Sequence, residues 1–151
     1  MAQHDENHWL WRLDAAAWLG AAANELAQGE ALVAVRRTAV THARRAAGMA
    51  LNAVLVELAR RTDSPERSEV IWGRSYIDHL RVLADPGLDP SLREPFDLEL
   101  SGCCRELLAI SVMPPTGLVS LARARDEAAT KALALARQIV ETCASFCSRA
   151  H

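Results

Sequence analysis

The stretch from Gly29 to Arg61 constrains the fold more than any other part of the sequence. Its apolar residues recur at the spacings of three, four and seven that place side chains on one face of an α-helix. The main apolar line consists of Val33, Val40, Ala47, Leu51, Val54 and Leu58. The polar side that remains is narrow and is made mainly by Arg37, Thr41, Arg45 and Asn52. A helix with so little polar surface has to be covered on two sides, so we expect it at the centre of a bundle.

The rest of the chain also reads as helical, because glycine and proline mark few breaks and the segments between them are rich in alanine. We expect a first helix over residues 6–28 that stops at Gly29, a third from Ser64-Pro65 to Asp85-Pro86, a fourth over residues 96–112, and a last one capped by Thr116. No run alternates as a strand would. The sequence therefore predicts one all-α domain over residues 1–151, an up-and-down bundle of four to five helices.

Composition excludes several classes of function. Lys+Arg 17 and Asp+Glu 19 give a net charge of -2, so no overall field draws the chain onto nucleic acid or an anionic membrane. The N-terminal text MAQHDENH lacks the basic start and apolar run of a secretion signal. No apolar stretch approaches the roughly 20 residues of a membrane span. We expect a cytoplasmic protein with no membrane contact.

Four cysteines, Cys103, Cys104, Cys143 and Cys147, are expected to be small buried residues, because disulfides are rare in a reducing cytoplasm. Neither CxxC nor HExxH spacing is present, so we expect no metal site and no cofactor. A glycine-rich phosphate loop and a nucleophile elbow are also absent from the sequence, which argues against a metabolic enzyme.

Two segments resemble the first two helices of HEPN domains: WLGAAANEL from Trp18 to Leu26, and THARRAAGMALNAVL from Thr41 to Leu55. Within the second of these segments, Gly48 and Asn52 stand where the family often has Glu and Lys. The closing helix around ALALARQI is similar to the last HEPN helix. The resemblance implies a HEPN-like helical bundle that commonly forms homodimers. It also implies one of two kinds of member: metal-independent ribonucleases, such as toxins of toxin-antitoxin systems, or inactive relatives that bind RNA, nucleotide or a nucleotidyltransferase partner.

The ribonuclease members carry an R-x(4-6)-H motif, and the text from Arg74 to His79, RSYIDH, matches it. An imidazole of near-neutral pKa can exchange protons with a 2′-hydroxyl and a leaving group, and a guanidinium can neutralise charge on the phosphate. Arg81 replaces the tyrosine that often follows two residues after the histidine. The other interpretation is structural: Arg74 and Asp78 form an i, i+4 ion pair, and His79 is a partly covered polar residue.

Arginines on the long central helix form a second candidate site. Arg37 and Arg44 lie seven residues apart and almost in line, and with Arg45 they are candidates for binding nucleic acid or nucleotide. Arg44 lies at the edge of the apolar face, where an ion pair with Asp14 or Glu25 of the first helix is the alternative. His42, near the same edge, is expected to be structural.

The tryptophans are expected to be core or interface anchors. Trp9 and Trp11 should point to different faces of a helix, which favours a homodimer or another partner over one of them. Together these features predict a non-catalytic, HEPN-like interaction module that binds RNA, nucleotide or a partner protein such as a nucleotidyltransferase. The alternative is a metal-independent endoribonuclease that uses Arg74 and His79.

Overall fold

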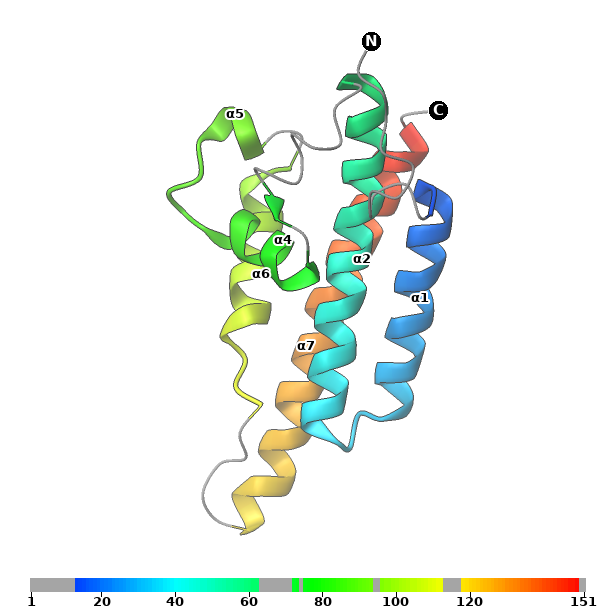
Figure 1. Ribbon diagram of the computed structural model, residues 1–151. Helices are drawn as coiled ribbons and strands as arrows, with labels where there is room; N and C mark the ends of the chain where they lie inside the picture. The colour runs from blue at the N-terminus through cyan, green and yellow to red at the C-terminus, as the bar shows by residue number, and fades with distance from the viewer. Residues whose placement is uncertain (1–12, 63–71, 74, 94–95, 113–117, 150–151) are drawn as a thin grey trace.

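The computed structural model describes residues 13–62, 72–73, 75–93, 96–112 and 118–149. These residues contain no strand and form α1 (Ala15–Ala31), α2 (Arg36–Thr62), α4 (Tyr76–Ala84), α5 (Pro90–Arg93), α6 (Leu98–Ala109) and α7 (Leu118–Arg149) (Figure 1). The long helices α1, α2 and α7 and the shorter α6 alternate in direction along the bundle, while α4 packs against α2 and α6. The expectation of an all-α, up-and-down bundle is therefore confirmed. None of the described helices is long and apolar enough to span a membrane.

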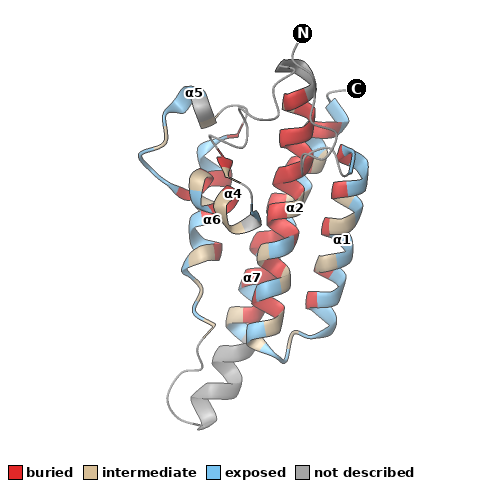
Figure 2. Cartoon of the chain, in the orientation of Figure 1, coloured by how far each residue is buried: buried red, intermediate tan, exposed pale blue. Residues whose placement is uncertain are grey.

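Helix α2 is the centre of the bundle, as expected, because it packs against α1, α4 and α7. Every residue from Ala50 to Glu57 is buried, and Figure 2 shows this half of α2 as a nearly continuous buried strip. The expected polar side is confirmed for Arg37, Thr41 and Arg45, which are exposed. It is wrong for Asn52, which is only 2% exposed, because α2 is packed against three other helices, α1, α4 and α7.

The boundary between the first two helices differs from the expected one. Gly29 does not end the first helix: α1 continues to Ala31 and α2 starts at Arg36. A Cβ atom at Gly29 would lie 2.8 Å from Leu133 Cδ2 and 3.1 Å from His42 Cβ. The glycine is therefore placed where α1, α2 and α7 approach closely, and not where the chain has to turn.

The start of the first helix also differs from the expected one. Asp14 is the N-cap of α1, and its side chain accepts a hydrogen bond of 2.8 Å from the amide of Ala17. Helix α1 therefore begins at Ala15, and the expected start near residue 6 lies outside the described residues. Trp18 and Trp72 are both buried. The ring of Trp72 packs edge to face against that of Phe96, with 5.6 Å between the ring centroids.

The expected third helix is interrupted. Gly73 adopts a φ of 81°, in the left-handed region, and Ser75 then caps a new helix, α4. Ser75 and Asp78 form a reciprocal capping box, with distances of 3.1 Å from the Asp78 amide to Ser75 Oγ and 3.4 Å from the Ser75 amide to Asp78 Oδ2. The expected end before Asp85 is confirmed. The expected start at residues 64–65 lies outside the described residues.

Replacing Gly73 by alanine is expected to lower the free energy of unfolding by about 2 kcal/mol, as measured by urea denaturation. A side chain in the left-handed region costs roughly 1–2 kcal/mol. In addition, the new Cβ would lie 2.6 Å from Asp78 Cβ, within the capping box. Gly20→Ala is the matched control, because a Cβ there meets nothing within 4 Å. Because residue 20 lies in the middle of α1, Gly20→Ala should raise the free energy of unfolding by up to about 1 kcal/mol. Equal effects of Gly73→Ala and Gly20→Ala would contradict the role assigned to Gly73.

The two remaining expected helices are present with shifted ends. The expected helix over residues 96–112 is the shorter α6, capped by Asp97, whose carboxylate accepts from the Leu100 amide at 2.8 Å. The last helix is α7, although its expected cap at Thr116 lies outside the described residues. Helix α5, which was not expected, is a single turn within the linker between α4 and α6.

Candidate functional site

His79 is the residue that the ribonuclease motif made most interesting, and its side chain is fully buried. Its Nε2 lies 3.3 Å from the carbonyl oxygen of Gly73. Burial lowers the pKa of His79 to about 4, although the backbone of Gly73, the backbone of Gly48 in α2 and the Asp78 carboxylate act in the opposite direction. At neutral pH the imidazole is therefore uncharged, and it lies where α4 packs against α2.

This position bears on the expected pair of Arg74 and His79. A general acid or base has to lie within hydrogen-bond reach of its substrate, and the buried ring of His79 lacks that access in this conformation. Arg74 lies outside the described residues. Helix α4, which carries His79, begins at Tyr76 after its cap at Ser75.

Arg44 has a structural partner that the sequence did not indicate. Its guanidinium Nη2 donates to the carbonyl oxygens of Leu107, Leu108 and Ile110, at 3.3, 3.2 and 2.8 Å. These carbonyls belong to the C-terminal end of α6, where helix carbonyls lack partners within the helix. Desolvation lowers the pKa of Arg44. Arg44 therefore caps α6 and joins it to α2.

The expected ion pair of Arg44 with Asp14 or Glu25 is replaced by other contacts. Asp14 caps α1. Glu25 instead contacts His42, with 2.5 Å between Glu25 Oε2 and His42 Nδ1, and both side chains are 14% exposed. This contact joins α1 to α2, in agreement with a structural role for His42.

Arg37 and Arg45 remain on the surface, so the expected group of three arginines is divided. Both are exposed and lie eight residues apart on α2, with exposed Thr41 between them. The Thr41 hydroxyl donates to the carbonyl of Arg37 at 2.8 Å and so lies against the helix. These residues form a polar line on the half of α2 that comes before the part covered by α4.

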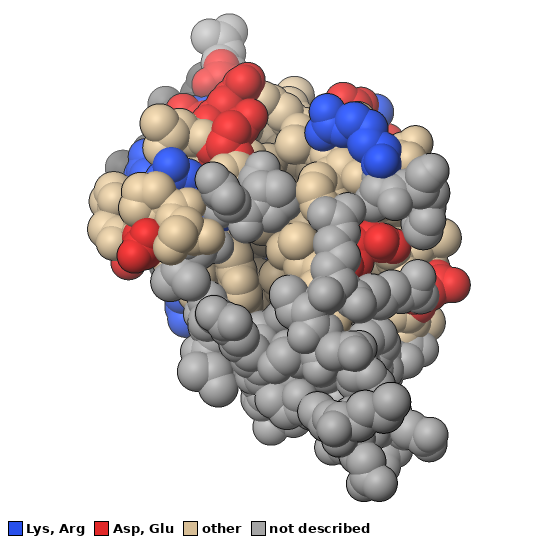
Figure 3. Space-filling model, turned by 90° about the horizontal axis from the view of Figure 1, so that it is seen from above, with Lys and Arg blue, Asp and Glu red and all other residues tan. Residues whose placement is uncertain are grey.

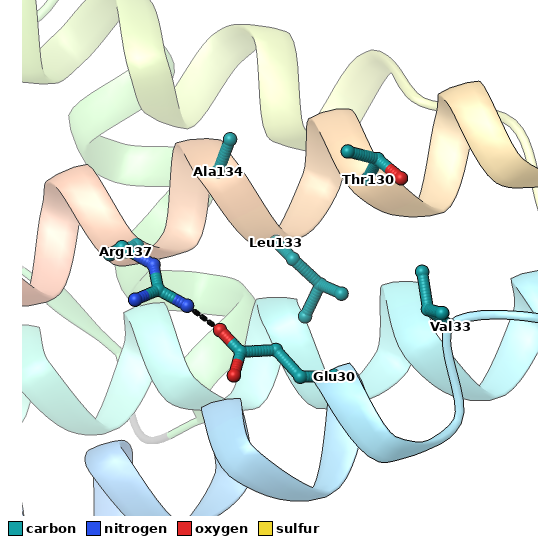
Figure 4. Close-up of a pocket in the computed structure, with 6 residues that line it drawn as sticks. All are labelled: Glu30, Val33, Thr130, Leu133, Ala134 and Arg137. Carbon is teal, nitrogen blue, oxygen red and sulfur yellow. Dashed lines mark ion pairs between the residues drawn. The ribbon is translucent and has the colours of Figure 1, made fainter.

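Two pockets open near this end of the bundle. The first, the apolar groove, has a volume of about 290 Å³ and is lined by Glu30, Val33, Thr130, Leu133, Ala134 and Arg137. Figure 4 shows Arg137 of α7 paired with Glu30 of α1 at one side of this groove. The second, the Arg36–Lys131 pocket, has a volume of about 320 Å³ and is lined by Arg36, Ile110, Ser111, Glu127, Ala128 and Lys131. Sequence reasoning missed both pockets, because their residues come from segments far apart in the chain.

The four cysteines are buried and free, as expected. Burial raises the pKa of Cys104 to about 12 and that of Cys147 to about 11, so both remain protonated at neutral pH. A protonated thiol is a poor nucleophile and a poor metal ligand. Within the described part of the chain, no three His, Cys, Asp or Glu side chains gather as metal ligands would.

The opposite end of the bundle is less distinctive in charge. Seen from above, its described surface carries both acidic and basic side chains (Figure 3). This view offers no surface of a single sign, in keeping with the near balance of charges in the whole chain.

Comparison of the chain with protein-family models, curated proteins and solved structures gave no match. The resemblance to HEPN domains therefore rests on the residues of the chain itself. It enters the functional argument as a proposal.

Proposed function

We propose that this chain is a non-catalytic, HEPN-like interaction module that binds RNA or a nucleotide. The observation that carries the proposal is the burial of His79, which leaves the histidine of the ribonuclease-like motif in the packing between α4 and α2. Chemistry that needs an exposed imidazole is disfavoured by this placement. Binding through surface residues is compatible with it.

The exposed arginines of α2 support RNA or nucleotide as the ligand. Arg37 and Arg45 are exposed on α2, and Arg37 directly follows Arg36, which lines a pocket together with Lys131. Clustered cations bind the phosphates of nucleic acids without a need for sequence recognition. Arg44 is excluded from this role in the proposal, because its guanidinium is held by carbonyls of α6.

A homodimer and a nucleotidyltransferase partner remain further proposals. The chain exposes apolar side chains at the turn between α1 and α2, where Leu32 is 41% and Val35 is 51% exposed. An exposed apolar surface of this kind suits a protein contact. The tryptophan argument for a dimer concerns Trp9 and Trp11, which lie outside the described residues.

RNA binding is tested by titrating labelled single-stranded RNA with the purified chain in EDTA, over a series of salt concentrations. We expect binding without cleavage. If Arg37 and Arg45 each contact one phosphate, Arg37→Gln with Arg45→Gln should lower the slope of log K against log salt by about 2. The matched control is Arg93→Gln with Arg149→Gln, which removes two cations from α5 and from the end of α7 and should leave the slope unchanged.

Two outcomes would contradict the proposal. Cleavage in EDTA that a folded His79→Gln variant loses would support the endoribonuclease that uses Arg74 and His79. Absence of RNA and nucleotide binding at low salt would remove the proposed ligand and favour a protein partner.

A further inference from the structure

The Arg36–Lys131 pocket brings together groups from three distant parts of the chain. Arg36 is the first residue of α2, Ser111 follows the end of α6, and Glu127 and Lys131 lie on α7. The apolar part of the lining is Ile110 and Ala128. The pocket therefore combines two cations, one carboxylate and one hydroxyl with a small apolar surface.

One wall of this pocket is fixed by a residue outside it. Arg44 donates to the carbonyl of Ile110 at 2.8 Å and to the carbonyls of Leu107 and Leu108. Ile110 and Ser111 are thereby held where the chain leaves α6. A wall held by charged hydrogen bonds is preorganised, so a ligand loses less free energy in ordering it.

The charges of the pocket favour an anion. The lining carries two positive charges, on Arg36 and Lys131, and one negative charge, on Glu127. Arg37, next to Arg36, adds an exposed positive charge. The first turn of α2 contains no acidic side chain. Excess positive charge in a concave surface attracts and retains anions.

We propose that the Arg36–Lys131 pocket binds a phosphate group. A guanidinium matches two phosphate oxygens with two parallel donors, an ammonium adds a compact charge, and the Ser111 hydroxyl is a further donor. The pocket volume of about 320 Å³ exceeds the size of a phosphate alone and leaves room for an attached group against Ile110 and Ala128. The inference rests on the proposed function, because the phosphate belongs to a nucleotide or to the RNA backbone.

The test follows amide resonances of the full chain by NMR while inorganic phosphate, adenosine monophosphate or a short RNA is added at constant ionic strength, with sodium chloride as the reference. We expect shifts at Arg36, Ser111 and Lys131 that chloride does not produce. The double variant Arg36→Gln with Lys131→Gln should lower the affinity at least about tenfold, as the loss of one charged hydrogen bond or more would. Arg137→Gln, which removes a cation elsewhere on α7, is the matched control and should change the affinity less than about twofold.

The three ligands separate the sources of the phosphate and the two proposals. Loss of RNA binding in the double variant assigns the pocket to the RNA backbone, whereas loss of adenosine monophosphate binding alone assigns it to a free nucleotide. Equal weakening by Arg137→Gln, or equal shifts with chloride, would overturn the pocket. If the native chain and the double variant bind RNA equally, and neither inorganic phosphate nor adenosine monophosphate shifts the resonances, the phosphate-binding pocket is overturned. The proposed function would then still stand. Phosphate binding without RNA or nucleotide binding would contradict the proposed function and not the pocket.

Discussion

Acidification from pH 7 to pH 4 is expected to lower the free energy of unfolding by about 3 kcal/mol through His79 alone. In the unfolded chain this imidazole takes up a proton as the pH falls through 6.5, whereas the buried ring resists protonation until about pH 4. Between these values the unfolded state binds more protons than the folded state, so stability falls as the pH falls. The loss should be complete below the folded pKa and reversible when the pH is raised.

The measurement is urea denaturation at several pH values between 7 and 4, for the native chain and for His79→Gln. Glutamine does not titrate and can still donate to the carbonyl of Gly73, so the variant should fold with roughly 1–2 kcal/mol less stability at pH 7. Carboxylates also titrate in this range, and the difference between the two curves isolates His79. His42→Gln removes a histidine between α1 and α2 and should keep the part of the acid dependence that comes from His79. If His79→Gln loses as much stability on acidification as the native chain, His79 is not the source of the acid dependence, and the conclusion that it is buried in its neutral form is wrong.

The central position of α2 was predictable, because its apolar periodicity leaves no alternative to burial on several sides. The burial of Asn52 was not predictable, since it depends on the helices that pack against α2, and these come from distant parts of the chain. A polar residue on an apolar helix reads as exposed until the neighbouring helix is known.

The two glycines show why helix ends were harder to predict. Gly29 reads as a stop, yet α1 continues through it to Ala31. The residue is a glycine because α7 and α2 approach α1 too closely at this point for a side chain. Gly73 lies within an expected helix, yet its φ of 81° is part of the break before α4. Glycine permits both uses, and only the surrounding packing decides between them. The cap and capping box at Ser75 were the available sequence signal, since Ser75 precedes Asp78 by three residues.

The candidate site was partly predictable for the same kind of reason. Exposure of Arg37 and Arg45 follows from their places on α2, which local periodicity gives. The role of Arg44 depends on carbonyls 63 to 66 residues away, which no local pattern reveals. Arg105 behaves similarly, because its Nε donates at 3.1 Å to the carbonyl of Ala84, the last residue of α4. Two arginines that look like surface cations in the sequence thus cap the ends of helices.

Arg44→Met is expected to lower the free energy of unfolding by about 2–4 kcal/mol. Methionine keeps much of the apolar stem, so the change removes mainly the hydrogen bonds to Leu107, Leu108 and Ile110. Hydrogen bonds from a charged donor are worth roughly 1.5–3 kcal/mol, and a cation at a helix C-terminus adds a further part through the helix dipole. The measurement is urea denaturation, combined with amide hydrogen exchange, which should become faster in the last turn of α6.

The neighbouring arginine provides the control, because Arg45 is exposed on the same turn of α2. Arg45→Met should change stability by less than about 0.5 kcal/mol, as substitutions at exposed positions usually do, and should leave exchange in α6 unaltered. Arg44→Lys should recover only part of the lost stability, since the ammonium nitrogen of lysine lies one bond closer to the backbone than Nη2, the atom that makes all three hydrogen bonds. Similar losses for the two methionine variants would mean that Arg44 acts through its charge alone. The carbonyls of α6 would then have another source of stabilisation, and the proposed rigidity of the Arg36–Lys131 pocket would lose its basis.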